Sequence, residues 1–501
     1  MDASMMELEL TSDYENAISQ VGYGLFHYWL LLICGLGNAN EAIAIICISF
    51  LLPAAECELK LTTPQKGWLT IIMFVGMMFG GYFGGAISDL YGRRNILVWC
   101  LLFNGFFIII MSLSTTYHFL LAAILFVGIG LGSSVPIIWA YFTEFQPKAM
   151  RGTALCYLSS FWMIGNISVS ILGRIIIPDS SSIKDLHSRW SLQGWRLFVA
   201  LCSIPSFVVA FALLFLPKSP KFLMMEKKNG QALRVLKIIH STNCGTKNKP
   251  FTLDLSNTES STEPEMKKSV YYAMILMSRN TSRLLHFPFR NVFCAIVLIV
   301  FSLCFGYYGL WMWLPEIFKR MEHNLSNDVG ICDLPSPSPI TSFSKDDCTH
   351  SLDSEIFTEE IFVALFNIPG HLIAILFMDK VGRRLFLMTG MIFSGLSVFA
   401  VWLVTTKWSC LLLSSLFGML TTLSHSALGV LGMEVFPTDL RGTACGVSQI
   451  AARLGAILGN LVFGQLVDSR CSVPVLMVAT FLVLGGLFSQ VMPDLTRMPL
   501  L

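Results

Sequence analysis

The sequence predicts an all-α membrane protein with twelve transmembrane helices in two pseudo-symmetric six-helix bundles. Its composition is the first reason. Hydrophobic residues make up 54% of the 501 residues and charged residues 13%, whereas a soluble domain carries roughly 25% charge. Within a bilayer only helices and closed barrels satisfy their own backbone, and long unbroken apolar runs lack the alternation of barrel strands. The exterior is therefore expected to face lipid.

The spacing of the apolar runs is the second reason. A helix that crosses a membrane needs about 20 mostly apolar residues. Twelve segments meet this length, and six of them precede the polar stretch 217–289 while six follow it. They lie near 28–52, 68–88, 95–114, 118–142, 155–177, 195–216, 290–314, 357–378, 385–406, 408–432, 443–467 and 472–492.

An internal duplication is the third reason. Two unrelated motifs each occur twice, and both pairs are separated by 290 residues. The first motif consists of Asp89, Gly92, Arg93 and Arg94, repeated as Asp379, Gly382, Arg383 and Arg384. The second consists of Glu144 and Arg151, repeated as Glu434 and Arg441. One offset shared by two motifs indicates that the halves are copies of one unit.

Basic residues in the loops predict the orientation, because they concentrate on the cytoplasmic side. Segment 217–290 holds thirteen Lys or Arg against five acids, whereas 316–360 holds three against ten. The expected order is a cytoplasmic tail 1–27, an N-terminal bundle 28–216, a cytoplasmic linker 217–289, a C-terminal bundle 290–492 and a cytoplasmic tail 493–501. The linker is expected to contain an amphipathic helix at 231–240, and residues 316–356 form an outer or lumenal loop. No signal peptide is expected in the first 28 residues.

The outer loop carries two modification candidates. Cys332 and Cys348 are expected to form a disulfide if the loop faces an oxidising compartment, with two free thiols as the alternative. Asn324 begins an Asn-Leu-Ser acceptor for N-glycosylation.

The repeated motifs are predicted to act as gates. Their glycine permits a tight turn between spans while the arginines stay in water. The acid and base of the second motif lie at the cytoplasmic ends of the fourth and tenth spans. Such charges can clamp the two bundles together on one face and release when that face opens. The alternative is that they only anchor the loops, but two copies at matched positions favour the gate.

On these motifs the chain resembles the major facilitator superfamily over essentially its whole length. Residues 217–223 resemble a pattern of its sugar-porter and organic-ion branches. Residues 52–56, 161–165 and 307–310 are similar to the synaptic vesicle glycoprotein 2 family. The resemblance implies that the first, fourth, seventh and tenth spans line a central cavity. It also implies that the second, fifth, eighth and eleventh spans form the moving interface.

Two charges are expected near mid-membrane, where each is costly unless paired or hydrated. Glu41 lies halfway along the first span, and Arg453 lies about 18 Å from the inner end of the eleventh. Glu41 is a candidate to meet a cationic solute or a proton, and Arg453 to meet an anionic group. A purely structural pair is the alternative. Asn38, one turn before Glu41, is assigned to the same site.

Aromatic residues form a second candidate group for solute binding: Trp162, Tyr308 and Trp313, with Tyr307 and Trp311 beside them. Their rings offer apolar area with one polar group. For Trp311 and Trp313 an interfacial belt is favoured instead, because they lie near the end of a span. Trp162 resembles a cavity tryptophan of the related family. His371 and His425 are interpreted as separate packing residues.

The sequence predicts a secondary active transporter of a small organic solute, either an organic ion or a sugar-like molecule, that works by alternating access. No catalytic, metal or cofactor motif is apparent, so neither an enzyme nor a cofactor is expected. The net charge of +2 and the lack of a basic cluster give no sign of nucleic-acid binding. The expected partners are the solute, a coupling ion and the bilayer of a plasma or vesicle membrane, around a monomer. The alternative is a non-transporting carrier-fold protein that serves as a binding partner or trafficking receptor.

Overall fold

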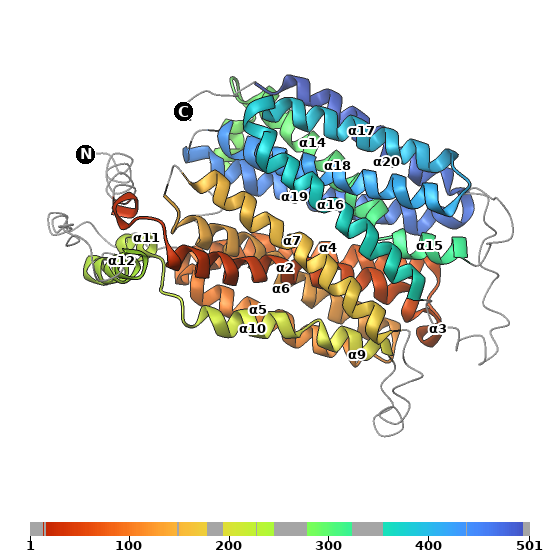
Figure 1. The fold of residues 1–501 in the computed structure, drawn as a ribbon, viewed down its shortest axis with the longest axis horizontal. Coiled ribbons are helices and arrows are strands. Elements are labelled where there is room, and N and C mark those ends of the chain that lie inside the picture. Colours follow the sequence, from red (N-terminus) through yellow and green to blue (C-terminus); the bar gives the residue numbers. More distant parts are fainter. Residues whose placement is uncertain are drawn as a thin grey trace.

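A computed structural model describes residues 14, 17–147, 150–177, 194–226, 228–244, 278–322, 354–436 and 438–493. Within these residues twelve helices are long and apolar enough to cross a membrane. Each predicted span falls on one of them, so the predicted fold class is confirmed. Figure 1 shows the N-terminal bundle in red to yellow below the C-terminal bundle in green to blue.

The N-terminal bundle consists of six spans. They are α2 (Leu25–Ala54), α4 (Thr63–Tyr91), α5 (Arg93–Ser112), α6 (Tyr117–Thr143), α7 (Arg151–Ile176) and the pair α9 (Gly194–Leu201) and α10 (Ile204–Leu213). The sixth span is interrupted between α9 and α10. Pro205 occupies the first turn of α10, where its missing N–H costs no helical hydrogen bond.

The C-terminal bundle repeats this arrangement. Its spans are α14 (Arg290–Trp311), α16 (Ser354–Val381), α17 (Arg383–Leu403), α18 (Lys407–Glu434), α19 (Thr438–Arg470) and α20 (Ser472–Phe488), followed by the short 3₁₀ helix η5 (Ser489–Val491). The seventh span breaks after α14, and α15 (Leu314–Glu322) begins at the turn that contains Pro315. A proline is tolerated in the first turn of a helix but not in its interior, which is consistent with the break at this position.

The backbone preserves the duplication at the two repeated turns. Gly92 joins α4 to α5 with φ 91° and ψ 128°, and Gly382 joins α16 to α17 with φ 108° and ψ 134°. Both values lie in the positive-φ region that favours glycine. The copies also pack alike, since α4 lies against α6 as α16 lies against α18.

Small residues bring α4 and α6 into backbone contact. A Cβ on Gly80 would lie 2.1 Å from the carbonyl oxygen of Ile129, and a Cβ on Gly132 would lie 2.1 Å from that of Met77. Any side chain there would separate the helices. The glycines at 128–132 therefore serve close helix packing, as their sequence context predicts.

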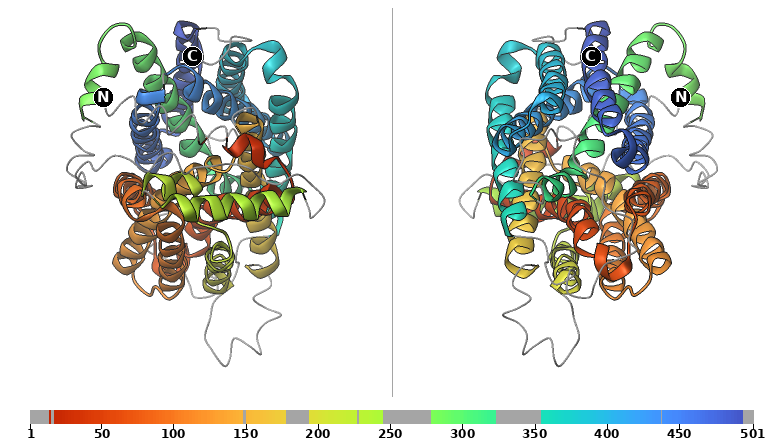
Figure 2. Two further views of the ribbon diagram at one scale, coloured as in Figure 1. Left: turned by 90° about the vertical axis from the view of Figure 1, so that its left-hand side faces the viewer. Right: turned by 90° about the vertical axis from the view of Figure 1, so that its right-hand side faces the viewer.

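The two ends of the molecule differ in what covers them. We call the end with the Gly92 and Gly382 turns the inner end, at the left of Figure 1, and the opposite end, with α3 (Glu56–Leu59) and α15, the outer end. At the inner end α11 (Pro220–Met225) leads into α12 (Asn229–Cys244). Figure 2 shows α12 lying across the N-terminal bundle.

The predicted amphipathic segment 231–240 lies within α12 and packs on protein. Its apolar residues Ala232, Leu236 and Ile239 are buried. At its end the Asn243 side-chain oxygen accepts a hydrogen bond from the Phe26 N–H at 3.1 Å, near the start of α2. The helix therefore fixes the inner end of the N-terminal bundle.

Three predicted modification residues, Asn324, Cys332 and Cys348, lie outside the described residues. The sequence analysis did not single out Cys471, which lies between α19 and α20 at the outer end and is disulfide-bonded. A disulfide at this end agrees with an oxidising outer compartment.

Candidate functional site

An ion pair joins the two bundles at the centre of the membrane-spanning region. The Nη2 atom of Arg453 on α19 lies 3.4 Å from Oε1 of Glu41 on α2. The two side chains are 12% and 7% exposed. The structure thus brings together the two charges that the sequence placed at mid-depth. Each charge offsets part of the other's desolvation cost.

Tyr308 holds Arg453 from the α14 side. The Arg453 guanidinium and the Tyr308 side chain are close enough to interact electrostatically. The Tyr308 ring lies 4.9 Å from the ring of Phe74 on α4, measured between centroids. Arg453 therefore pairs with Glu41 of one bundle beside Tyr308 of the other, so a shift between the bundles must change its contacts.

Aromatic rings form one wall beside this ion pair. The Trp162 indole on α7 lies close enough to the Tyr307 side chain on α14 to interact with it. Tyr307 stacks on Trp311 at 5.4 Å and meets the ring of His425 edge-on at 5.2 Å. Trp162 is thus one aromatic residue through which the N-terminal bundle meets the C-terminal wall, as Phe74 is another.

His371 and His425 are not isolated, contrary to the sequence interpretation. They lie on the packed helices α16 and α18, close enough to interact electrostatically. Nε2 of His425 lies 3.9 Å from the Cys304 thiol, and Nδ1 of His371 lies 3.4 Å from the Ser426 hydroxyl. The pairing depends on helix packing between distant segments, which single positions in the sequence cannot reveal.

The interfacial belt expected for Trp311 and Trp313 is wrong. Trp311 is 3% exposed and Trp313 is fully buried. The indole N–H of Trp313 donates to the Asn460 side-chain oxygen at 3.2 Å, and its ring stacks on Phe463. The helix break after Trp311 directs the chain inward between the bundles. Trp313 therefore packs at the outer end, apart from the Glu41–Arg453 pair.

The side chain of Asn38 makes its hydrogen bonds within its own bundle. Its amide nitrogen donates to the Leu158 carbonyl at 3.3 Å, and its oxygen accepts from the Trp139 indole at 3.2 Å. Both partners belong to the N-terminal bundle. The prediction that Asn38 shares the Glu41 site is not matched by these contacts.

A second charged cluster was missed by the sequence analysis, and we call it the outer ion cluster. Lys66 at the start of α4 is fully buried, with its ammonium 2.8 Å from Glu56 and 2.9 Å from Glu316. Lys319 lies 2.6 Å from Glu56. These four residues link α3 and α4 of one bundle to α15 of the other. One of them, Glu56, stands in the segment 52–56 that carries the family resemblance, which was the available signal.

The predicted gating charges form contacts within the N-terminal bundle. Nη1 of Arg93 lies 3.1 Å from Oε1 of Glu144. Arg94 donates to the carbonyls of Leu213 and Leu214 at 3.0 and 2.6 Å, and Arg151 donates to that of Gln146 at 3.4 Å. Arg383 and Arg384 begin α17. The side chains of Asp89, Asp379, Glu434 and Arg441 lie outside the described part of the structure.

The described part of α4 contacts the other bundle closely at its outer end. A Cβ on Gly67 of α4 would lie 2.9 Å from Cα of Gly464 on α19. Gly85 follows eighteen residues later, which is about five turns, and so lies on the same face of α4. Among the described residues, a Cβ there would meet nothing within 4 Å.

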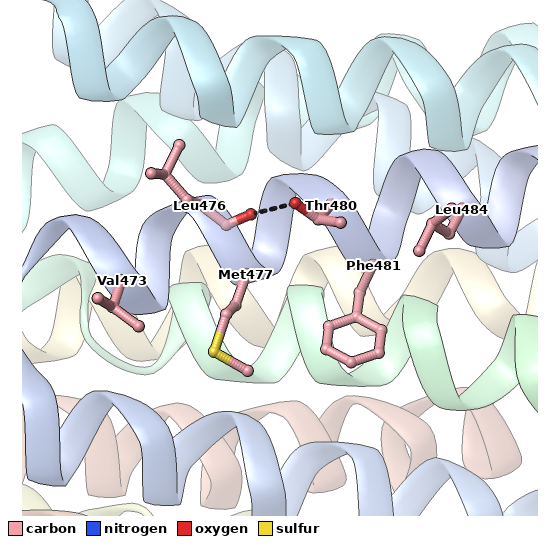
Figure 3. Close-up of a pocket in the computed structure, with 6 residues that line it drawn as sticks. All are labelled: Val473, Leu476, Met477, Thr480, Phe481 and Leu484. Atoms are coloured by element: carbon pink, nitrogen blue, oxygen red, sulfur yellow. Dashed lines mark hydrogen bonds between the residues drawn. The ribbon is translucent and has the colours of Figure 1, made fainter.

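The surface groove in Figure 3 is a different feature. It lies along α20 and is lined by Val473, Leu476, Met477, Thr480, Phe481 and Leu484. The Thr480 hydroxyl donates to the Leu476 carbonyl of the same helix at 2.8 Å. None of these six residues is charged, and an apolar groove on a membrane helix suits a lipid chain. The buried ion pair is the better candidate for a solute site.

Comparisons with known proteins agree with this architecture. The family described as sugar (and other) transporter matches residues 25–328 and 347–492. Human synaptic vesicle glycoprotein 2C is 28% identical, over 97% of this chain and 81% of that protein. Rat synaptic vesicle glycoprotein 2A is 26% identical, over 97% and 79%.

Solved structures show the same fold at low identity. The xylose transporter XylE of E. coli, in a partially occluded inward-open conformation, superposes with a TM-score of 0.69 at 16% identity. That match covers 95% of this chain and 99% of the transporter. Its inward-open form gives a TM-score of 0.66 at 18% identity, over 95% and 98%. Because the family match spans most of the sequence, the chain belongs to the sugar (and other) transporter family of the major facilitator superfamily, and its relatives include the synaptic vesicle glycoproteins 2.

Proposed function

We propose that this protein is a secondary active transporter that moves a small organic solute by alternating access, with the solute bound beside Glu41 and Arg453. The observation that carries the proposal is the ion pair between the bundles, 3.4 Å long and mostly buried. Intramembrane charges are costly and mark solute or ion paths by default. A pair that spans the moving interface can exchange its partner for a solute during the cycle.

The chemistry of the centre suits an organic ion or a sugar-like molecule. Arg453 offers guanidinium donors, Glu41 offers carboxylate acceptors, and Tyr308 offers a hydroxyl group. Trp162 and Tyr307 add aromatic faces. A structural neighbour transports xylose, and a hydroxylated ring would use the same kinds of group. The solute class is therefore small, polar in part and apolar in part.

Alternating access is supported by the contrast along α4. Gly67 touches Gly464 at the outer end, while Gly85 on the same face meets nothing within 4 Å. In carriers built from repeats, rocking of one bundle against the other opens the two ends in turn. We propose that the repeated charged motifs close the inner end when the outer end opens. The coupling ion would be a proton, as in a structurally similar proton:xylose symporter.

Uptake into liposomes tests the proposal. The purified protein would be reconstituted and assayed with a labelled pentose, an organic cation and an organic anion. Saturable uptake of at least one solute is expected, with Glu41→Gln and Arg453→Ala each lowering it at least tenfold. Glu226→Gln is the matched control, because Glu226 pairs with Lys228 at 3.0 Å in the linker. Unchanged uptake in both central variants would reject this site.

A second candidate is a carrier-fold protein that binds without transporting, as a binding partner or trafficking receptor in a vesicle or plasma membrane. Asn38 favours it, since the related family usually has an Asp there and this Asn is held by packing contacts. Solute binding without uptake, together with capture of a partner through residues 316–356, would support this candidate over the first.

A further inference from the structure

Glu360 is a buried acid that the central ion pair does not use. It lies on α16, is 4% exposed, and its Oε1 atom has no hydrogen-bond partner among the described residues. The preceding residue, Glu359, pairs with Lys407 at 2.6 Å. An ionised carboxylate in a low-dielectric region is costly unless a cation balances it. A carboxyl group in this place is therefore suited to ionise when a cation binds beside it.

The position of Glu360 on α16 places it at the boundary between the bundles. Phe357, three residues earlier, lies 2.8 Å from where a Cβ on Gly173 of α7 would be, and its ring lies 5.0 Å from that of Phe50 on α2. Residues three apart share a helix face. Glu360 therefore continues this face one turn inward, and it is close enough to Tyr307 to interact electrostatically.

Asn166 reaches the same region from α7. It lies four residues after Trp162, which is close to Tyr307, and seven before Gly173, which meets Phe357. This spacing sets all three residues on one face of α7. Asn166 is 1% exposed, and its Oδ1 has no hydrogen-bond partner within the described part of the chain. Two oxygens without hydrogen bonds thus lie within about two helical turns inward of the Phe357–Gly173 contact, one on each bundle.

The described charges around this point include no basic partner for Glu360. Glu41 is paired with Arg453, and Glu359 with Lys407. Among the charged groups that act on Glu360, Glu359 is also an acid. A carboxylate and an amide oxygen, both acceptors, lie beside the Trp162 and Tyr307 rings. An ammonium group supplies donors for such acceptors and is attracted to aromatic faces.

We propose that Glu360 and Asn166 form a second subsite, outward of the Trp162–Tyr307 contact, that binds the ammonium group of a cationic solute. The inference rests on the proposed transport function and narrows its solute class to amines. The Glu41–Arg453 pair would then hold the remaining polar groups of the solute. Glu360 and Asn166 act here as residues that determine specificity.

Binding to the purified full-length protein tests the subsite separately from transport. The probes are labelled tyramine and its neutral counterpart tyrosol, which carries a hydroxyl in place of the amine. We expect the unaltered protein to bind tyramine at least tenfold more tightly than tyrosol. Glu360→Gln should lower tyramine affinity at least tenfold and change tyrosol affinity less than twofold. Asn166→Ala should lower tyramine affinity by about threefold to tenfold.

Glu359→Gln is the matched control, because this neighbouring acid already has a lysine partner, and it should leave the preference for tyramine intact. Gel filtration and melting temperature check that each variant is folded. An equal loss of both ligands in folded Glu360→Gln, or no preference for tyramine in the unaltered protein, would overturn the subsite. Selective tyramine binding without uptake would support the subsite and count against transport. Uptake that needs Glu41 but shows no preference for amines would support transport and count against the subsite.

Discussion

The outer and inner ends of this protein use charged residues in opposite ways. At the outer end, Lys66 reaches Glu316 at 2.9 Å and Lys319 reaches Glu56 at 2.6 Å, and both contacts cross between the bundles. At the inner end, the described pair of Arg93 and Glu144, at 3.1 Å, stays inside the N-terminal bundle. The contrast shows that the outer ion cluster joins the two bundles, while the described Arg93–Glu144 pair joins helices of one bundle.

Removing the central lysine of the outer ion cluster should have the largest effect. Lys66→Met removes the ammonium group that lies 2.9 Å from Glu316, a residue that is 4% exposed. Breaking a buried pair on one side costs about 3–5 kcal/mol. We expect a lower melting temperature and faster hydrogen–deuterium exchange in α15 and the first turns of α4.

The double variant Lys66→Met/Glu316→Leu separates charge from packing. Because most of the cost is a stranded carboxylate, removing that carboxylate as well should recover part of the lost stability. Glu56 keeps Lys319 as a partner in this variant. A double variant no more stable than Lys66→Met would show that the buried charge is not the cause.

Two glycines on one face of α4 provide a matched test of the closure. Gly67→Leu would force a side chain against Gly464, whereas Gly85→Leu enters open space. Overpacking a close contact costs about 1–3 kcal/mol. We expect Gly67→Leu to speed exchange at the outer ends of α4 and α19, and Gly85→Leu to leave exchange there unchanged. Equal effects of the two substitutions would contradict an outer-closed, inner-open arrangement.

The sequence predicted most of the fold because lipid as a solvent imposes a simple rule on composition. Apolar runs of sufficient length located the twelve spans, and the 290-residue offset anticipated the matched turns at Gly92 and Gly382. Depth along a span also predicted that Glu41 and Arg453 lie at one level. Their contact then follows because the two bundles pack face to face at that level.

The sequence did not predict the outer ion cluster or the proposed second subsite, because both depend on side chains that are buried near the ends of spans. Glu360 falls within the predicted span 357–378 but was only counted among the acids of segment 316–360, whereas α16 begins at Ser354 and buries it. Lys66 stands in the first turn of α4, where a lysine ordinarily reaches water. Both side chains are buried by contacts with the opposite bundle, and the hydropathy of the sequence does not show which residues such contacts will bury.

A smaller effect is expected at the inner end. Arg93 is 25% exposed, so its pair with Glu144 is partly screened and worth about 1 kcal/mol or less. Arg93→Ala should therefore lower the melting temperature only slightly in detergent. If the inner motifs also clamp the bundles in the other state, uptake should fall by more than this stability change explains. If uptake falls only as much as the amount of folded protein falls, the motif anchors the loop and does not act as a gate.

The smallest effect should come from Trp313, which belongs to the outer closure and not to the solute site. Trp313→Phe removes the indole N–H that donates to Asn460 while keeping an aromatic ring against Phe463. The loss of one buried hydrogen bond costs about 1 kcal/mol, seen as a small drop in melting temperature. Solute affinity should stay within twofold, whereas Trp162→Phe, which removes the indole N–H beside Tyr307, should weaken it several-fold. If Trp313→Phe weakened binding as much as Trp162→Phe, the solute would have to extend into the outer closure, and the boundary drawn here between the closure and the central site would be wrong.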